Sequence, residues 1–101
     1  MRYLQMLNIV PSNQFKKDLK LAKKRGLNLG LLTSVIDTLA SQKPLDVKYH
    51  DHNLSGNYRS FRECHIEPDW LLVYRVDDDQ LELVLFRTGT YSDLFEMQRG
   101  V

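Results

Sequence analysis

The sequence contains little that could build a disulfide, a metal centre or a membrane span. Its 101 residues include one cysteine, Cys64, which excludes an internal disulfide and is typical of a reducing cytoplasm. No apolar run is long enough to cross a bilayer, and no signal peptide is recognisable. A P-loop and a dinucleotide-binding glycine motif are also missing. These absences predict one small cytoplasmic domain over residues 1–101, with no cofactor and no membrane contact.

The net charge of +1 conceals a strong asymmetry between the two halves of the chain. Residues 1–48 contain nine Lys or Arg against three Asp or Glu, whereas residues 49–101 contain five Arg against ten acidic residues. A near-neutral total argues against tight non-specific binding to nucleic acid. A basic face in the first half could still meet phosphate locally.

The first half of the chain predicts a strand followed by two helices. Residues 3–10 have strand character, and residues 14–25 and 29–41 have apolar positions at helical spacing. Gly26 can end the first helix, and Pro44 ends the second. The other faces of the first helix carry lysines: Lys16, Lys17, Lys20, Lys23 and Lys24. A charged helix face is usually only solvated, and the alternative is a surface that contacts the phosphates of a large RNA.

The second half predicts antiparallel strands. After a polar connection over residues 43–57, strand-like runs cover residues 58–66, 70–76 and 81–88, separated by short turns. The whole pattern indicates an α+β fold: an N-terminal strand, an αα-hairpin, and an antiparallel sheet of three to four strands with the helices on one face.

Local spacing argues against a metal or thiol centre. His50 and His52 are two residues apart in a polar loop, which is not a common zinc spacing. Cys64 and His65 are adjacent, so on a strand their side chains point to opposite faces and cannot form a nucleophilic pair. We therefore expect no metal site and a packed, unreactive cysteine.

Four polar residues lie at the ends of the predicted strands: His52, His65, Asp69 and Arg87. If the strand ends converge, these side chains suit acid–base cleavage of a phosphodiester, because imidazoles transfer protons and a guanidinium binds phosphate. Alternation along the last strand places Arg87 with Leu81, Leu83 and Leu85. The other interpretation is a structural histidine, a turn aspartate and a surface arginine. Spacing alone favours this second interpretation.

Two longer segments change that balance. "YHDHNLSGNYRSFRECHIEPDWLLVYR" (residues 49–75), followed by "LVLFRTGTYSDLF" (residues 83–95), resembles the YafQ branch of the RelE/ParE superfamily of bacterial toxins. The resemblance implies a RelE-like microbial ribonuclease fold and a ribosome-dependent endonuclease that cuts mRNA in the decoding site. Such toxins work without a metal: the ribose 2′-OH attacks the phosphate, leaving a 2′,3′-cyclic phosphate and a 5′-OH.

The resemblance also implies partners. The chain would bind the ribosome and mRNA, and a cognate antitoxin of the DinJ or RelB kind would silence it. The toxin–antitoxin complex would be a hetero-oligomer that binds DNA through the antitoxin.

Carried over by position, the resemblance implies a role for nine residues. His52, His65 and Asp69 match acid–base and RNA-positioning residues, and Arg87 matches the arginine that stabilises charge on the phosphate. Tyr91 occupies the place where a histidine usually serves as the candidate general acid. The implied substrate contacts are Phe95, Arg62 and His50, and Trp70 is a secondary candidate for stacking, with packing in the core as the alternative.

Two departures from the family pattern leave alternatives open. His50 stands where Lys or Arg is common, and Tyr91 replaces the usual histidine; a phenol donates its proton less readily unless Arg87 lowers its pKa. One alternative is a toxin that inhibits by binding, as gyrase-directed relatives do. Another is a weakened toxin that is retained in an antitoxin complex repressing its own operon.

Overall fold

The computed structural model describes residues 5–99, and residues 3 and 4 of the first predicted strand lie outside this range. Three helices and five strands follow in the order β1 (Asn8–Pro11), α1 (Asn13–Lys24), α2 (Leu29–Ala40), β2 (His52–Asn53), β3 (Arg62–Glu67), β4 (Trp70–Asp77), β5 (Glu82–Gly89) and α3 (Phe95–Arg99). Two short 3₁₀ turns, Val47–Tyr49 and Gly56–Tyr58, flank β2. No helix within the described range is long and apolar enough to span a membrane.

The strands form one mixed sheet in the order β1-β5-β4-β3-β2. Strands β2 to β5 pair antiparallel, whereas β1 pairs parallel with β5. The predicted α+β class is confirmed. The sheet has five strands because β1 joins its far edge and a two-residue strand, β2, forms inside the predicted polar connection. The β1–β5 pairing joins residues 74 positions apart, and β2 is only two residues long, so local patterns indicate neither strand pairing.

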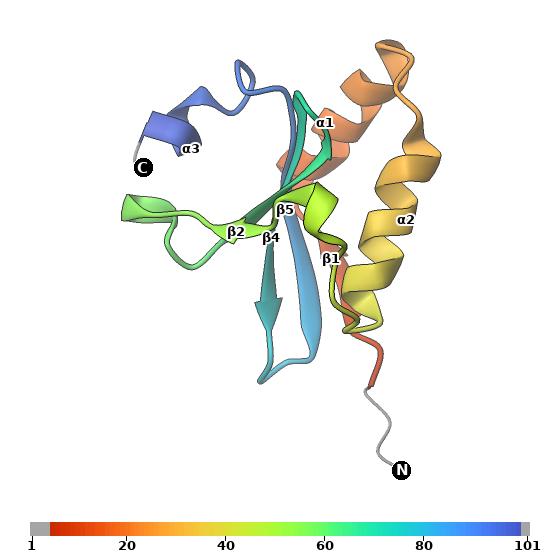
Figure 1. The fold of residues 1–101 in the computed structure, drawn as a ribbon, viewed down its shortest axis with the longest axis vertical. Coiled ribbons are helices and arrows are strands. Elements are labelled where there is room, and N and C mark those ends of the chain that lie inside the picture. Colours follow the sequence, from red (N-terminus) through yellow and green to blue (C-terminus); the bar gives the residue numbers. More distant parts are fainter. Residues whose placement is uncertain (1–4, 100–101) are drawn as a thin grey trace.

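Each face of the sheet has its own apolar core. Figure 1 shows α1 and α2 along one side of the sheet and α3 on the other. The helix-covered core buries Phe15, Leu32, Val35, Leu72, Tyr74, Leu83 and Leu85, among others. The second core is smaller and contains Leu54, Leu71, Val73, Leu94 and Met97. The lysines of α1 stay exposed, but Asp18 on the same helix is buried.

A β-bulge at Phe86 decides which way the end of β5 faces. Val73 on β4 lies opposite Arg87, yet the next residue, Tyr74, lies opposite Leu85, so Phe86 is the extra residue. Ser12, the N-cap of α1, donates its hydroxyl hydrogen to the Phe86 carbonyl at 2.7 Å. The bulge moves Arg87 to the face opposite Leu85. The prediction from strict alternation was therefore wrong, because a bulge re-aims the side chains that follow it.

Candidate functional site

The residues with acid–base side chains line up across the face of the sheet that α1 and α2 leave uncovered. His52 on β2 is opposite Glu63 on β3, Glu63 is opposite Val73 on β4, and Val73 is opposite Arg87 on β5. Directly opposed residues share a sheet face, and neighbouring strands lie about 4.8 Å apart. The four strands therefore carry one row from His52 to Arg87. His65 follows two residues after Glu63 and shares its face.

His65 is at the centre of a cluster of rings. Its ring centroid lies 5.8 Å from that of His50, 6.2 Å from that of His52 and 5.8 Å from that of Tyr91. The Tyr91 hydroxyl lies 3.4 Å from His65 Nε2, and His65 Nδ1 lies 3.3 Å from the Pro68 carbonyl. The structure thus brings together residues from β2, β3 and the segment after β5.

Glu63 is a member of this group that was not predicted. Its side chain is 1% exposed, and its two oxygens face His52 Nε2, at 3.4 Å, and the amide of Gln98. His52 Nδ1 lies 2.7 Å from the His50 carbonyl, which can only accept, so Nδ1 carries a proton. A hydrogen bond between Nε2 and Glu63 then needs one more proton shared by the pair. In the sequence, Glu63 could have been found from its place two residues before His65, which puts both side chains on the same face of a strand.

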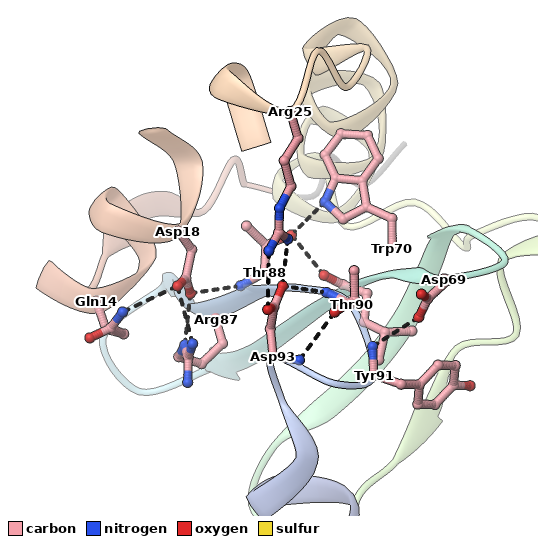
Figure 2. A network of polar contacts seen from close by, with 11 residues as sticks. Gln14, Asp18, Arg25, Asp69, Trp70, Arg87, Thr88, Thr90, Tyr91 and Asp93 are labelled. Atoms are coloured by element: carbon pink, nitrogen blue, oxygen red, sulfur yellow. Dashed lines mark hydrogen bonds and ion pairs between the residues drawn. The ribbon is translucent and has the colours of Figure 1, made fainter. Parts of the chain in front are cut away.

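Asp69 holds the segment that carries Tyr91. The Asp69 carboxylate accepts the Tyr91 backbone N–H at 2.9 Å. Partial burial raises the pKa of the Tyr91 phenol above its usual value, and the charges of Glu63 and Asp69 add to this. Arg87 therefore does not lower the pKa of Tyr91, contrary to the possibility that the sequence leaves open. In Figure 2 the Tyr91 ring points away from Arg87.

Arg87 is held at the edge of β5 by a buried carboxylate of α1. Its Nε and Nη2 donate to Asp18 at 2.7 and 3.1 Å, and the same carboxylate accepts the Thr88 N–H at 3.1 Å and the Gln14 amide at 3.2 Å. Figure 2 shows Asp18 reaching from α1 to this point. The Asp18 side chain is 7% exposed and that of Arg87 is 23% exposed. Local sequence patterns do not indicate this pair, because its partners are 69 residues apart.

A second ion pair fixes the turn after β5. Arg25 donates to Asp93 at 2.6 Å, and Asp93 also accepts the Thr90 N–H at 3.0 Å. The Arg25 hydrogen bond lowers the pKa of Asp93 to about 2. Gly89 has no left-handed φ, but a Cβ there would come within 2.8 Å of the Asp93 carboxylate. Gly89 is therefore required by the close approach of the Asp93 side chain.

Two of the predicted substrate contacts are engaged within the protein. Trp70 is 2% exposed, packs in the helix-covered core, and donates its indole N–H to the Thr88 hydroxyl at 2.9 Å. Burial excludes Trp70 from stacking on a substrate, which corrects the prediction. The Arg62 guanidinium donates to Asp51 at 2.8 and 3.1 Å and to Asn53 at 2.6 Å. This network braces β2 against β3, and a substrate contact by Arg62 stays a prediction.

The other two predicted contacts are accessible. Phe95 begins α3 and is 57% exposed. His50 is exposed, and its left-handed backbone places its ring beside His65. Both residues stay candidates for contact with RNA.

Three side chains of the site could together hold a metal ion. One ligand atom from each of His52, Glu63 and His65 lies within 4.8 Å of the others. Sequence spacing did not indicate this group because two of its members are on β3 and one is on β2. Buried Cys64, by contrast, stays protonated, since burial raises the pKa of its thiol to about 12.

Comparisons with known proteins identify the family of the chain. Residues 7–96 match the family model described as the bacterial toxin of a type II toxin–antitoxin system, YafQ. The mRNA interferase toxin YafQ of Escherichia coli K12 is 40% identical over 85 residues, which cover 83% of this chain and 90% of that protein.

Solved structures give the same result. A metal-bound toxin from Helicobacter pylori superimposes with a TM-score of 0.85 at 48% identity, covering 89% of this chain and 100% of that one. YafQ in the E. coli DinJ–YafQ toxin–antitoxin complex gives a TM-score of 0.81 at 38% identity, covering 89% and 98%. The chain belongs to the YafQ family of type II toxin–antitoxin toxins.

Proposed function

We propose that this chain is a ribosome-dependent mRNA endoribonuclease that cuts without a metal ion. One observation carries the proposal: the row from His52 through Glu63 to Arg87, with His65 and Tyr91 beside it, places proton-transfer groups and a fixed cation on one open sheet face. The relation to the E. coli mRNA interferase supports the same activity.

The geometry supports a division of roles. The 2′-OH of the nucleotide before the cut loses its proton to the Glu63–His52 pair, where a buried carboxylate and an imidazole already face each other at 3.4 Å. The new O2′–P bond forms as the P–O5′ bond breaks, and the leaving O5′ takes a proton from Tyr91 or from His65 beside it. Arg87 offsets the charge that develops on the phosphate oxygens.

This assignment leaves no step that requires a metal. Both proton transfers have a side chain to carry them, and the charge on the phosphate meets a guanidinium that Asp18 holds in place. Asp69 keeps Tyr91 near the cluster by accepting its backbone N–H, and Phe95 and His50, both exposed, would help to order the RNA.

We further propose that a cognate antitoxin of the DinJ or RelB type binds this chain, as DinJ binds the E. coli relative. The bound antitoxin would block the open face and carry the complex to operator DNA. The free toxin would act on ribosomes in the cytoplasm.

A second candidate is a weakened toxin that serves mainly in the antitoxin complex. The raised pKa of Tyr91 favours it, because a phenol that holds its proton more tightly is a slower general acid. The gyrase-type alternative does not explain the cluster of His52, Glu63 and His65, because inhibition by binding needs no proton-transfer groups.

The proposed function is tested with purified protein, defined mRNA and purified ribosomes. We expect cleavage within codons when ribosomes translate the mRNA, little or no cleavage of naked mRNA, and full activity in EDTA with Mg²⁺ supplied only to the level that the ribosomes need. Gyrase supercoiling assays run in parallel. Growth arrest with intact mRNA would contradict the ribonuclease proposal, and inhibition of supercoiling would support the gyrase alternative.

A further inference from the structure

A cavity of about 540 Å³ opens directly beside the candidate catalytic cluster. It is bounded by Leu31 of α2, by Tyr49 and His50 before β2, and by His65 and Pro68 around the end of β3. His50 and His65 therefore belong both to this cavity and to the ring cluster. The volume lies within the range of small-molecule sites.

The lining has the chemistry of a nucleotide site. Leu31, Ile66 and Pro68 supply apolar surface, and the rings of Tyr49 and His50 supply aromatic surface on which a base can stack. The Tyr49 ring packs against the helix-covered core, which holds its position. Lys48 lies on the rim with its Nζ 5.2 Å from the centre of the Tyr49 ring. A cation at this place can bind the phosphate that follows the base.

The charge on the rim also orients a bound nucleotide. Lys48 lies on the rim with Glu67, whose carboxylate repels phosphate but accepts N–H groups. A bound phosphate is therefore favoured near Lys48 and disfavoured near Glu67, and base N–H groups can donate to Glu67.

The proposed reaction gives such a site a purpose. Attack by a 2′-OH requires the attacking oxygen, the phosphorus and the leaving oxygen to be in line, which stacked RNA does not allow. One nucleotide beside the cut must therefore turn out of the stack, and its unstacked base needs a receptor. The cavity is next to the reacting groups, because His65 both lines it and belongs to the candidate catalytic cluster.

We propose that this cavity binds the base of one mRNA nucleotide next to the scissile phosphate. The inference rests on the proposed function for its place in the reaction. Binding of a nucleotide to the cavity can nevertheless be measured without any cleavage.

The first measurement is NMR titration of the free protein with each of the four nucleoside 3′-monophosphates. We expect shifts at Leu31, Tyr49 and His50, and we expect them to be absent at Leu21. Leu31→Trp fills the cavity with an indole and should weaken binding about 10-fold or more. Leu21→Trp is the matched control, because Leu21 and Leu31 are both 41% exposed on their helices and Leu21 does not line the cavity.

The second measurement is cleavage of a defined mRNA on ribosomes, with every cut position mapped by sequencing. Leu31→Trp should change the nucleotide preference around the cut and lower the rate about 10-fold, whereas Leu21→Trp should match the unmodified protein. Tyr49→Leu provides a second variant if Leu31→Trp fails to fold. It removes the aromatic surface and keeps apolar volume against the core.

The outcomes separate the two proposals. Binding at the cavity without any cleavage by the unmodified protein would contradict the proposed function and support the nucleotide site. Cleavage with no nucleotide shifts at the cavity, and with an unchanged cut profile in Leu31→Trp, would overturn the site and leave the function intact.

Discussion

The two sides of the candidate site differ in how tightly their side chains are held. At the β5 side, Arg87 and Arg25 pair with Asp18 and Asp93 through contacts as short as 2.7 and 2.6 Å, and further hydrogen bonds to the backbone fix both carboxylates. At the β3 side, the contacts that join His65 to its neighbours are 3.3 and 3.4 Å long. The two arginines on the β5 side are therefore held tightly, whereas His65 on the β3 side is loosely coupled to its neighbours.

This difference matches what each side is proposed to do. A cation that stabilises developing charge works best when it is fixed before the reaction, because no reorganisation is then needed. Proton-transfer groups can adjust, and their hydrogen bonds are often long until a substrate is bound. We infer that the β5 side presets the electrostatic field and the β3 side adapts to the RNA.

The largest expected effect comes from removing the fixed cation. Arg87→Ala should lower single-turnover cleavage on ribosomes by about 10²–10³-fold, the range seen when one charge-stabilising donor is lost. Arg59→Ala, at an exposed position, is the control. Cleavage by Arg87→Ala within about 3-fold of the unmodified protein would show that this cation is not part of the chemistry.

Asp18→Asn tests whether the brace itself matters. We expect a loss of about 1–3 kcal/mol in the free energy of unfolding, below the range for a fully buried pair because Arg87 is partly exposed. Cleavage should fall about 10-fold, because Arg87 loses its orientation while keeping its charge. Asp37→Asn, exposed on α2, is the matched control.

A double-mutant cycle separates positioning from simple destabilisation. Below the unfolding temperature, Asp18→Asn should slow cleavage in the unmodified background and have no further effect on cleavage when Arg87→Ala is already present. An equal loss in both backgrounds, or faster cleavage by Asp18→Asn, would contradict a positioning role.

The sequence predicts the features that depend on neighbouring residues, and it does not predict those that depend on residues far apart in the chain. Helical spacing and turn residues locate α1, α2 and the three long strands to within a few residues, because those signals are local. The family motifs identify His52, His65 and Tyr91 as candidate site residues, and the structure places their rings close together. Neither signal reaches Asp18, since a single acidic residue among lysines resembles an ordinary solvated face.

The features that could not be predicted depend on register. The Phe86 bulge turns Arg87 to the open face, and strict alternation predicts the opposite. Glu63 resembles a surface carboxylate in the sequence, and only the pairing of β2 with β3 shows it buried against His52. The family motif makes Trp70 a candidate for stacking, but the fold buries its ring in the core, where the indole N–H donates to the Thr88 hydroxyl.

Tyr91→His tests the proton-transfer groups on the β3 side of the site. Since the pKa of Tyr91 lies above its usual value, the phenol stays protonated throughout pH 6–9, and this group should not make the rate fall as pH rises. An introduced imidazole has an ordinary pKa near 6.5, so the variant should be several-fold faster near pH 6 and should lose that gain above about pH 7. Single-turnover rates from pH 6 to 9 measure this.

Two outcomes would oppose that assignment. If Tyr91→Phe cleaves as fast as the unmodified protein, the Tyr91 hydroxyl is not the acid, and His65 takes that role. If Tyr91→His leaves both the rate and the pH profile unchanged, the position does not take part in the rate-limiting proton transfer.

The smallest expected effect is at the Arg25–Asp93 ion pair. The pKa of Asp93 is about 2 in the folded chain and lies below its ordinary value of 3.8, so its stabilising contribution is complete above about pH 4 and is lost as pH falls toward 2. Asp93→Asn should therefore be less stable than the unmodified protein at neutral pH, and the difference should shrink over this window. Urea unfolding at pH 7, 4 and 2.5 measures it; a difference that grows with acidity would contradict the pair.

The chemistry of the cut ends tests most directly whether the 2′-OH is the attacking group. mRNA cleaved on ribosomes by the unmodified protein should carry a 2′,3′-cyclic phosphate on one fragment and a 5′-OH on the other, because the attacking group is the neighbouring 2′-OH. End-specific ligation with RNA ligases that accept only one type of end, followed by sequencing, distinguishes the products. Fragments with 3′-OH and 5′-phosphate ends would show that water is the nucleophile and would contradict the roles proposed for Glu63, His52 and Arg87.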